Sequence, residues 1–253
     1  MLKIERQDKI MSLLDMNDIL STKSIADSLG VTGMTIRRDI YDLENQGLVV
    51  KIYGGVQKVQ KSLKELSTNE KINNNIAEKE EIGRIMDSLI SDNMTIYLGA
   101  GTTILHALKM FTKKNLFIVT NSFIAFKYII EETDYKVVLC GGEYNKNTEE
   151  FNGDLAERAF ENYNIDIAFA STNGIYSNNI TTSNVENGRI QKAAYKVAKV
   201  KAILADHTKL NKSDVYTFHH LDDVDFLITD SLVNSDIADY YGQMTKILNK
   251  EVS

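Results

Sequence analysis

The sequence predicts a two-domain α/β protein, in which a small helical domain with a β hairpin at its end precedes a larger domain built on a mostly parallel sheet. Residues 1–58 contain three short helical patterns followed by a glycine-bearing hairpin pattern. Beyond residue 70, β-rich segments alternate with amphipathic helical ones, as in parallel sheets that helices cover on both faces. A chain of 253 residues is long enough for two cores. We assign residues 1–58 to the first domain, 59–70 to a linker and 71–253 to the second domain.

The composition excludes several classes of protein. Apolar residues make up 43% of the chain and charged residues 25%, and no apolar run approaches the roughly 18 residues of a membrane span. The first residues carry too many charges for a signal peptide. Cys140 is the single cysteine, so one chain can form neither an internal disulfide nor a thiolate metal cluster. We expect a cytoplasmic protein that spans no membrane and holds no cofactor or metal.

The first two helices of the small domain are indicated by their ends. A first helix is predicted over residues 4–16 and a short strand at residues 19–20. Ser21 can cap a second helix, because its hydroxyl can accept a free first-turn N–H, and Gly30 can end that helix in a left-handed conformation. Only Val31 then separates Gly30 from the next capping residue, so the second and third helices form the tight turn of a helix-turn-helix.

The segment from Thr32 to Gly47 is predicted to be a helix suited to the major groove of DNA. Ile36, Ile40 and Leu43 lie on one stripe that can be buried, so the remaining face points outward. Asp39, beside the buried stripe, is predicted to form a structural ion pair. The residues predicted to contact DNA from this helix are Thr32, Met34, Thr35, Arg37, Arg38 and Tyr41.

Two β-rich segments, residues 48–52 and 56–59, flank Tyr53-Gly54-Gly55 and predict the hairpin wing of a winged helix-turn-helix. Lys51 and Tyr53 could contact DNA phosphates or simply stabilise the wing. Residues 1–60 carry no net charge and the rest of the chain carries −6, so DNA binding would depend on a local cluster of cations. That cluster consists of Arg37, Arg38, Lys51, Lys58, Lys61 and Lys64.

The second domain is predicted to begin with a helix that starts at Glu70. The strands that follow are predicted at residues 94–98, 116–120, 136–140, 165–170, 202–205 and 226–229. The helices between and after them are predicted at residues 102–111, 123–131, 154–163, 186–199 and 236–248.

The carboxyl ends of these strands carry glycine, hydroxyl and amide residues, and ligands of parallel α/β sheets bind at this edge. Gly99–Thr103 forms a glycine loop that leads into a helix, whose free N–H groups and two hydroxyls suit a phosphate. Together with Lys209, these loops favour a phosphorylated polyol or sugar. The predicted effector-binding residues are Gly99, Gly101, Thr102, Thr103, Asn121, Gly142, Asn173, Thr181, Thr182, Glu186, Asp206 and Lys209.

The motifs of the first domain resemble those of the DeoR family of bacterial repressors. The matching residues are Val31, Thr32, Thr35, Ile36, Arg37, Arg38, Asp39, Leu43, Gly47 and the wing residues Tyr53-Gly54-Gly55. The resemblance implies operator binding through the third helix, with the wing against the adjacent DNA backbone.

The second domain extends this resemblance over nearly the whole chain. The matching motifs are Gly99-x-Gly101-Thr102-Thr103, Asn121, Gly141-Gly142, Phe151-x-Gly153, Asn173-Gly174, Thr181-Thr182 and Asp206-x-x-Lys209. The resemblance implies a sensor domain that shares its fold with ribose-5-phosphate isomerase and binds a sugar phosphate. Within the family, the loops are most similar to a regulator of lactose metabolism that responds to tagatose 6-phosphate.

The leading hypothesis is a transcriptional repressor that a phosphorylated sugar releases from double-stranded operator DNA. Operators of such modules are usually repeated, which predicts a homodimer or homotetramer. An activator would differ only in the position of its operator, which the protein sequence does not specify.

Two other functions are disfavoured. A sugar-phosphate isomerase needs a carboxylate base beside the substrate, and the candidates for acid–base chemistry are Asp206, Glu186 and Lys209. We predict binding without turnover, with no catalytic residue. His219 and His220 are adjacent and would point to opposite sides of a strand, so we assign them no metal site.

Overall fold

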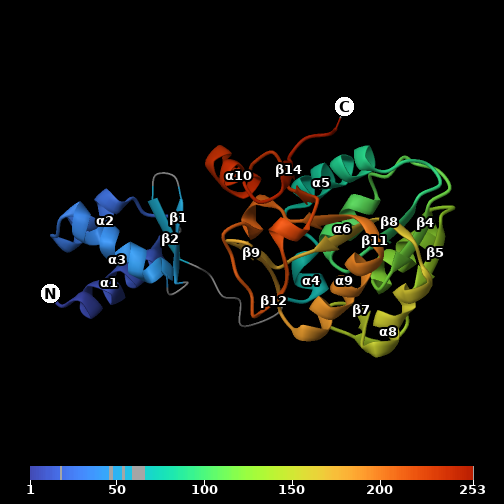
Figure 1. The fold of residues 1–253 in the computed structure, drawn as a ribbon, viewed down its shortest axis with the longest axis horizontal. Coiled ribbons are helices and arrows are strands. Elements are labelled where there is room, and N and C mark those ends of the chain that lie inside the picture. The colour runs from blue at the N-terminus through green and yellow to red at the C-terminus, as the bar shows by residue number, and fades with distance from the viewer. Residues whose placement is uncertain (18, 46–47, 53–54, 59–65, 253) are drawn as a thin grey trace. The chain divides into compact units, whose positions relative to one another are not determined.

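The computed structural model describes residues 1–17, 19–45, 48–52, 55–58 and 66–252. The chain forms two compact units, Met1–Gln60 and Lys61–Ser253 (Figure 1). Among the described residues, no helix has both the length and the apolar character needed to cross a membrane.

The first unit has the predicted winged helix-turn-helix elements. They are α1 (Lys3–Met16), α2 (Thr22–Leu29), α3 (Gly33–Asn45), β1 (Val49–Ile52) and β2 (Gly55–Lys58). Ser21 caps α2 as predicted, because its hydroxyl accepts the Ser24 N–H at 2.9 Å, and Gly30 ends the helix with a φ of 63°. The predicted strand at residues 19–20 is a single bridge, in which Leu20 and Val56 exchange backbone hydrogen bonds. Gly47, Tyr53, Gly54 and Val59 lie outside the described residues.

The core of this unit joins all three helices to the hairpin. Side chains of α1, α2, α3, β1 and β2 pack together in it, and its fully buried members are Ile10, Ile25, Ile36, Ile40, Val49 and Val56. The α3 stripe is thus the buried face that its spacing predicts, which leaves the opposite face of the helix exposed.

The second unit contains a seven-stranded sheet in the order β14-β13-β11-β8-β3-β4-β5, in which every neighbouring pair is parallel. Its strands are β3 (Thr95–Leu98), β4 (Phe117–Thr120), β5 (Lys136–Leu139), β8 (Ile165–Ser171), β11 (Ala198–Leu204), β13 (Phe226–Ile228) and β14 (Lys246–Leu248). The remaining strands are β6 (Glu143–Asn145), β7 (Glu150–Asn152), β9 (Gly174–Tyr176), β10 (Asn179–Thr182) and β12 (Tyr216–His220). The predicted parallel α/β domain is confirmed.

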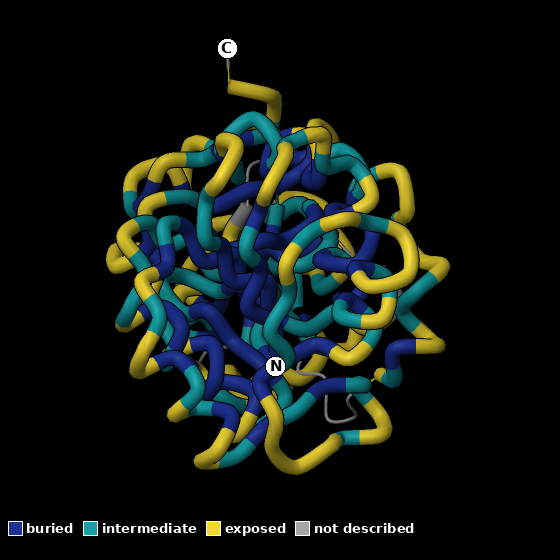
Figure 2. Tube along the Cα trace, turned by 90° about the vertical axis from the view of Figure 1, so that its right-hand side faces the viewer, coloured by how far each residue is buried: buried dark blue, intermediate teal, exposed yellow. Residues whose placement is uncertain are grey.

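Helices cover both faces of this sheet (Figure 1). They are α4 (Thr68–Lys71), α5 (Ile76–Leu89), α6 (Thr102–Leu108), α7 (Phe123–Glu132), α8 (Asp154–Arg158), α9 (Val185–Val197), α10 (Ser235–Gly242) and the 3₁₀ turns η1 (Ala159–Asn162), η2 (His207–Lys209) and η3 (Leu221–Asp223). Side chains alternate along β3: Ile96 and Leu98 pack with α5, α6 and α7, whereas Tyr97 packs with α8, α9 and α10. The core strands are therefore buried on both sides. Figure 2 shows that buried residues, in dark blue, gather in the interior of the trace.

Two helix predictions in this unit are wrong. The helix predicted from Glu70 is two helices, α4 and α5, because Asn75 adopts a left-handed conformation with a φ of 52°. The helix predicted over residues 236–248 ends at Gly242, and residues 246–248 form the parallel edge strand β14.

Two antiparallel elements were not predicted. β6 and β7 form a hairpin, and β9, β10 and β12 form a three-stranded sheet. These strands have three to five residues each. Segments this short carry too few alternating positions to be distinguished from loops.

Candidate functional sites

The outer face of α3 presents two unpaired guanidinium groups. Arg37 and Arg38 are exposed, and neither side chain has a hydrogen-bond or ion-pair partner among the described residues. Met34 and Tyr41 lie on the same outer surface, with 73% and 57% of their area exposed. Thr32 caps the helix, since its hydroxyl accepts the Thr35 N–H at 3.3 Å. The face can therefore donate hydrogen bonds to phosphates or base edges without first breaking an ion pair.

Asp39 has the structural role predicted for it. Its side chain is 1% exposed and forms an ion pair with Arg6 of α1, with Arg6 Nη2 3.0 Å from Asp39 Oδ1. Two nitrogen atoms of the guanidinium bond both carboxylate oxygens, which is the geometry that suits an Arg–carboxylate pair. This pair fixes α1 against the inner side of α3.

The lysines near the wing have partners within their own unit. Lys51 Nζ lies 2.6 Å from Glu44 Oε2 and 5.1 Å from the centre of the Tyr41 ring, and Lys58 pairs with Asp15. A DNA contact by Lys51 would compete with the bond to Glu44. The contact predicted for Tyr53 falls on a residue that the structure does not describe.

A cleft in the second unit lies where the sheet topology reverses. From β3 the chain proceeds to β4 and β5 on one side of the sheet, and then to β8, β11, β13 and β14 on the other. The loops that follow the carboxyl ends of β3 and β8 therefore diverge. Open α/β sheets bind ligands at such a point. Gly101 and Thr102 from the first loop and Asn173 from the second line a cleft of about 560 Å³, here called the wide cleft.

Three lysines line the wide cleft: Lys71, Lys79 and Lys209. The Lys79 side chain is 4% exposed, and its Nζ donates to the Lys71 carbonyl at 2.8 Å and to Thr102 Oγ1 at 3.0 Å. The pKa of Lys79 is lowered to about 8, mainly by burial; the charge of Asp206 opposes this change, and the charges of Lys209 and Lys71 add to it. The wide cleft therefore has an excess of positive charge, because three lysines and one carboxylate, Asp206, line it.

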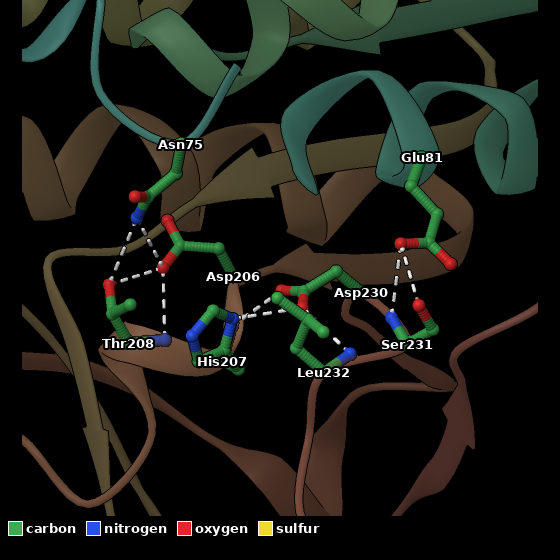
Figure 3. Close-up of polar contacts among 8 residues, drawn as sticks. All are labelled: Asn75, Glu81, Asp206, His207, Thr208, Asp230, Ser231 and Leu232. Atoms are coloured by element: carbon green, nitrogen blue, oxygen red, sulfur yellow. Dashed lines mark hydrogen bonds and ion pairs between the residues drawn. The ribbon is translucent and has the colours of Figure 1, made fainter. Parts of the chain in front are cut away.

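The Asp206 carboxylate forms hydrogen bonds within the wall of the wide cleft (Figure 3). Its Oδ1 accepts the Thr208 N–H at 3.0 Å and the Thr208 hydroxyl, so it caps η2. Asn75 Nδ2, from the turn before α5, lies 3.3 Å from both Asp206 Oδ1 and Thr208 Oγ1. These contacts join the end of β11 to the α4–α5 turn.

A second set of contacts in Figure 3 continues this wall. The buried Asp230 carboxylate accepts the His207 backbone N–H at 2.7 Å and the Leu232 N–H at 3.0 Å, and it lies 2.9 Å from His207 Nδ1. Glu81 of α5 accepts the Ser231 N–H and hydroxyl, both at 3.1 Å. The loops after β11 and β13 are thereby fixed to each other and to α5.

Most of the effector residues predicted from the sequence meet at this edge. Those that line the wide cleft are Gly101, Thr102, Thr103, Asn173, Asp206 and Lys209. Thr182 lines a narrower space that opens from it, here called the narrow recess. These residues lie close together because the carboxyl ends of parallel strands are at the same edge of the sheet.

Five predicted effector residues line neither the wide cleft nor the narrow recess: Gly99, Asn121, Gly142, Thr181 and Glu186. Asn121 is fully buried and bonded to Tyr97 and Phe151. Thr181 donates its hydroxyl to the Gly174 carbonyl at 2.8 Å. Glu186 is exposed and lines a separate hollow beside β6.

The two glycines among these five serve close backbone packing. A Cβ at Gly142 would lie 2.3 Å from the Asn152 carbonyl oxygen, and the φ of Gly142 is 150°. Gly99 donates its N–H to the Phe169 carbonyl at 2.9 Å, which continues the pairing of β3 with β8. Both positions shape the edge of the sheet without lining the cleft.

Three residues of the cleft were not predicted from the sequence, because they lie in or between helices that precede the sheet and not in the loops that follow strands: Lys71, Asn75 and Lys79. These residues precede the sheet and reach the cleft through the α4–α5 turn, which His106 Nε2 fixes at 2.8 Å from the Ile72 carbonyl. A signal was available: Ser67 and Glu70 form a capping box, which identifies a helix start before the break at Asn75.

The histidine pair has the geometry predicted for a strand. His219 packs against the Tyr195 ring, with centroids 5.0 Å apart, whereas His220 is exposed. Within the described part of the chain, no group of three or more His, Cys, Asp or Glu side chains could hold a metal ion. Burial raises the pKa of the Cys140 thiol to about 12 and leaves it protonated.

Comparisons with known proteins match both units. Residues 6–62 match the profile of the DeoR-like helix-turn-helix domain, and residues 74–231 match that of the DeoR C terminal sensor domain. The lactose phosphotransferase system repressor of Staphylococcus aureus (strain N315) is 34% identical over 231 residues, which cover 90% of this chain and 92% of that protein. An uncharacterized HTH-type transcriptional regulator of Haemophilus influenzae is 30% identical over 231 residues, covering 91% and 90% of the two chains.

Solved structures are more distant. Ribose 5-phosphate isomerase A of Methanocaldococcus jannaschii is 18% identical with a TM-score of 0.36, over 52% of this chain and 53% of that one. The sorbitol operon regulator SorC of Klebsiella pneumoniae is 11% identical with a TM-score of 0.32, over 81% and 89%. At these scores the structural likeness supports no conclusion about function.

Proposed function

This chain belongs to the DeoR family of transcriptional regulators, and we propose that it represses a sugar catabolism operon and leaves the operator when a phosphorylated sugar occupies the wide cleft. The proposed effector site rests on one observation: three lysines line the wide cleft, namely Lys71, Lys79 and Lys209. A phosphate monoester carries close to two negative charges at neutral pH, and ammonium groups are strong donors to it. The predicted effector residues that line the wide cleft complete this site.

The operator half rests on α3. Its N-terminal part and its exposed face would enter the major groove, as the later helix of a helix-turn-helix does. The residues proposed to contact the operator are Thr32, Met34, Thr35, Arg37, Arg38 and Tyr41, with Lys51 and Tyr53 from the wing. We further propose a homodimer or homotetramer in the cytoplasm, because a repeated operator is read by a symmetric protein.

The name of the similar staphylococcal protein supports lactose metabolism as the regulated process. Tagatose 6-phosphate is accordingly the proposed effector. Its phosphate would bind the three lysines, and its hydroxyls would face the polar walls of the cleft.

The alternative of a sugar-phosphate isomerase has less support. Of the two carboxylates considered as its base, Asp206 caps η2 and Glu186 lies outside the cleft. Family membership and the names of the relatives also indicate a regulator. A coupled isomerase assay with tagatose 6-phosphate should show no turnover.

Tagatose 6-phosphate should raise the thermal stability of the full chain. A ligand present at a hundred times its dissociation constant adds about 2.7 kcal/mol to the free energy of unfolding, because it binds only the folded state. For a domain of this size the midpoint should rise by roughly 5 to 11 °C. Tagatose without phosphate is the control, and an equal shift with both compounds would contradict a phosphate site.

The affinity for a phosphorylated sugar should fall as the pH rises through about 8, the pKa of Lys79 in the free protein. A bound phosphate favours the charged form of the Lys79 amine and therefore raises its pKa. At a pH above the pKa of the free protein, the amine must take up a proton when the ligand binds. The association constant should then decrease by up to about tenfold per pH unit. Calorimetric titrations from about pH 7 to about pH 9.5 measure this, and the Lys79→Met variant should lose the decrease. An affinity of the parent protein that stays constant over this range would refute the role of Lys79.

A further inference from the structure

The narrow recess continues the wide cleft toward the β6–β7 hairpin side of the sheet. The two spaces share Lys71, Gly101 and Thr102, so one ligand can extend from one into the other. The recess measures about 50 Å³, which is enough for about three water-sized groups by the usual volume of one probe sphere. It therefore admits the end of a polyol chain.

Charge differs between these two spaces. The wide cleft is lined by three lysines and one carboxylate, Asp206, whereas the narrow recess is lined by one lysine, Lys71, and one carboxylate, Glu150. We expect this difference to orient a phosphorylated ligand, with its phosphate at the three lysines of the wide cleft and its other end at Glu150. The recess then faces whatever group the sugar carries farthest from its phosphate.

Glu150 is held in a fixed position. Its side chain is 5% exposed, and its Oε2 accepts a hydrogen bond from Asn121 Nδ2 at 3.3 Å. Asn121 is itself fixed by the Tyr97 hydroxyl at 2.9 Å and by a bond to the Phe151 carbonyl at 3.2 Å. The carboxylate is thus placed by a buried chain of bonds and by its position in β7.

Other polar groups of the recess are bonded to the protein. Gln191 Oε1 accepts the Ser171 N–H at 3.0 Å, and Thr172 Oγ1 lies 2.7 Å from the Thr181 carbonyl. In contrast, Thr148 Oγ1 is buried without a hydrogen-bond partner among the described residues. A buried hydroxyl without a partner is costly, and a ligand hydroxyl would provide one.

We propose that Glu150 determines ligand specificity: it selects phosphorylated sugars whose far end is uncharged and rich in hydroxyls, and it rejects phosphorylated sugar acids. The inference rests on the proposed function of the cleft. A sugar hydroxyl donates to the carboxylate, whereas a sugar carboxylate would place a second negative charge beside a buried one. Thr148 completes the hydroxyl-binding end.

The test compares two classes of probe on the full chain by calorimetry. The neutral probes are tagatose 6-phosphate, galactose 6-phosphate and fructose 6-phosphate, and the acid is 6-phosphogluconate. The strongest neutral probe should bind at least about tenfold more tightly than the acid. In Glu150→Gln the ratio should fall to within about threefold, mainly because the acid binds better, whereas in Glu143→Gln, an exposed glutamate of β6, it should stay unchanged.

Equal binding of both classes by the parent protein, or an unchanged ratio in Glu150→Gln, would overturn the assignment. Thr148→Val is the second variant, and it should lose affinity for the neutral probe but keep the affinity for inorganic phosphate, which reports the lysines alone. An equal loss for both would also overturn it. If instead neither inorganic phosphate nor any phosphorylated probe binds the parent protein, the proposed function itself fails, and this outcome differs from binding without discrimination.

Discussion

Arg37→Ala is expected to weaken operator binding by roughly 5- to 150-fold, which corresponds to the 1–3 kcal/mol of a guanidinium contact to a base or phosphate. The structure supplies the reason: Arg37 is exposed on α3, and no described residue competes for its donors. The affinity for a phosphorylated sugar should not change, since the residue belongs to the other compact unit. Fluorescence anisotropy with labelled DNA from upstream of the regulated operon measures the effect.

Lys9→Ala is the matched control, because it removes the same charge from the exposed side of α1. It should weaken binding less than Arg37→Ala. Parental DNA affinity in Arg37→Ala would eliminate α3 as the operator-reading helix.

The second large effect concerns induction. Lys209→Ala should lower the affinity for tagatose 6-phosphate by roughly 10- to 150-fold, because a hydrogen bond to a charged group contributes about 1.5–3 kcal/mol. The side chain of Lys209 has no hydrogen-bond or ion-pair partner among the described residues, so its loss should leave the fold intact. The variant should still bind the operator and should fail to release it at effector concentrations that release the parent protein.

Lys192→Ala, on the exposed side of α9, is the control for a general change in charge. It should respond to the effector as the parent does. If Lys209→Ala releases the operator at the parental effector concentration, the wide cleft is not the effector site.

Features that depend on neighbouring residues could be predicted from the sequence, whereas features that depend on distant contacts could not. α3 could be predicted because its cap at Thr32 and its stripe of Ile36, Ile40 and Leu43 all lie within a dozen residues. The strands of the large sheet other than β14 are mostly apolar runs, so their approximate positions could also be predicted from neighbouring residues. Asp39 was recognisable as structural because it falls beside the buried stripe.

The features that were not predicted from the sequence depend on contacts between residues that are distant in the chain. Asn75 breaks the helix predicted from Glu70, and its bonds to Asp206 and Thr208 span more than a hundred residues of sequence. Lys79 occupies a helical position that an amphipathic pattern treats as solvated, yet tertiary packing buries it against Thr102. Residues 246–248 form a strand only because β13 offers an edge for pairing.

The roles of the site residues show the same division. Convergence at one sheet edge brought Gly101, Thr102, Asn173 and Lys209 together as predicted. Which of the edge residues face the ligand depends on how side chains turn, and Asn121 turns into the core. Sequence spacing contains no information on that choice.

The most direct test of the switch measures operator affinity of the full chain with and without saturating tagatose 6-phosphate. Allosteric couplings of about 1–3 kcal/mol predict a roughly 5- to 150-fold loss of DNA affinity when the effector is bound. Lys209→Ala should need a roughly 10- to 150-fold higher effector concentration for the same loss of DNA affinity. An effector that binds the parent protein, as judged by its thermal midpoint, but leaves operator affinity unchanged would contradict the account of a repressor released by a phosphorylated sugar.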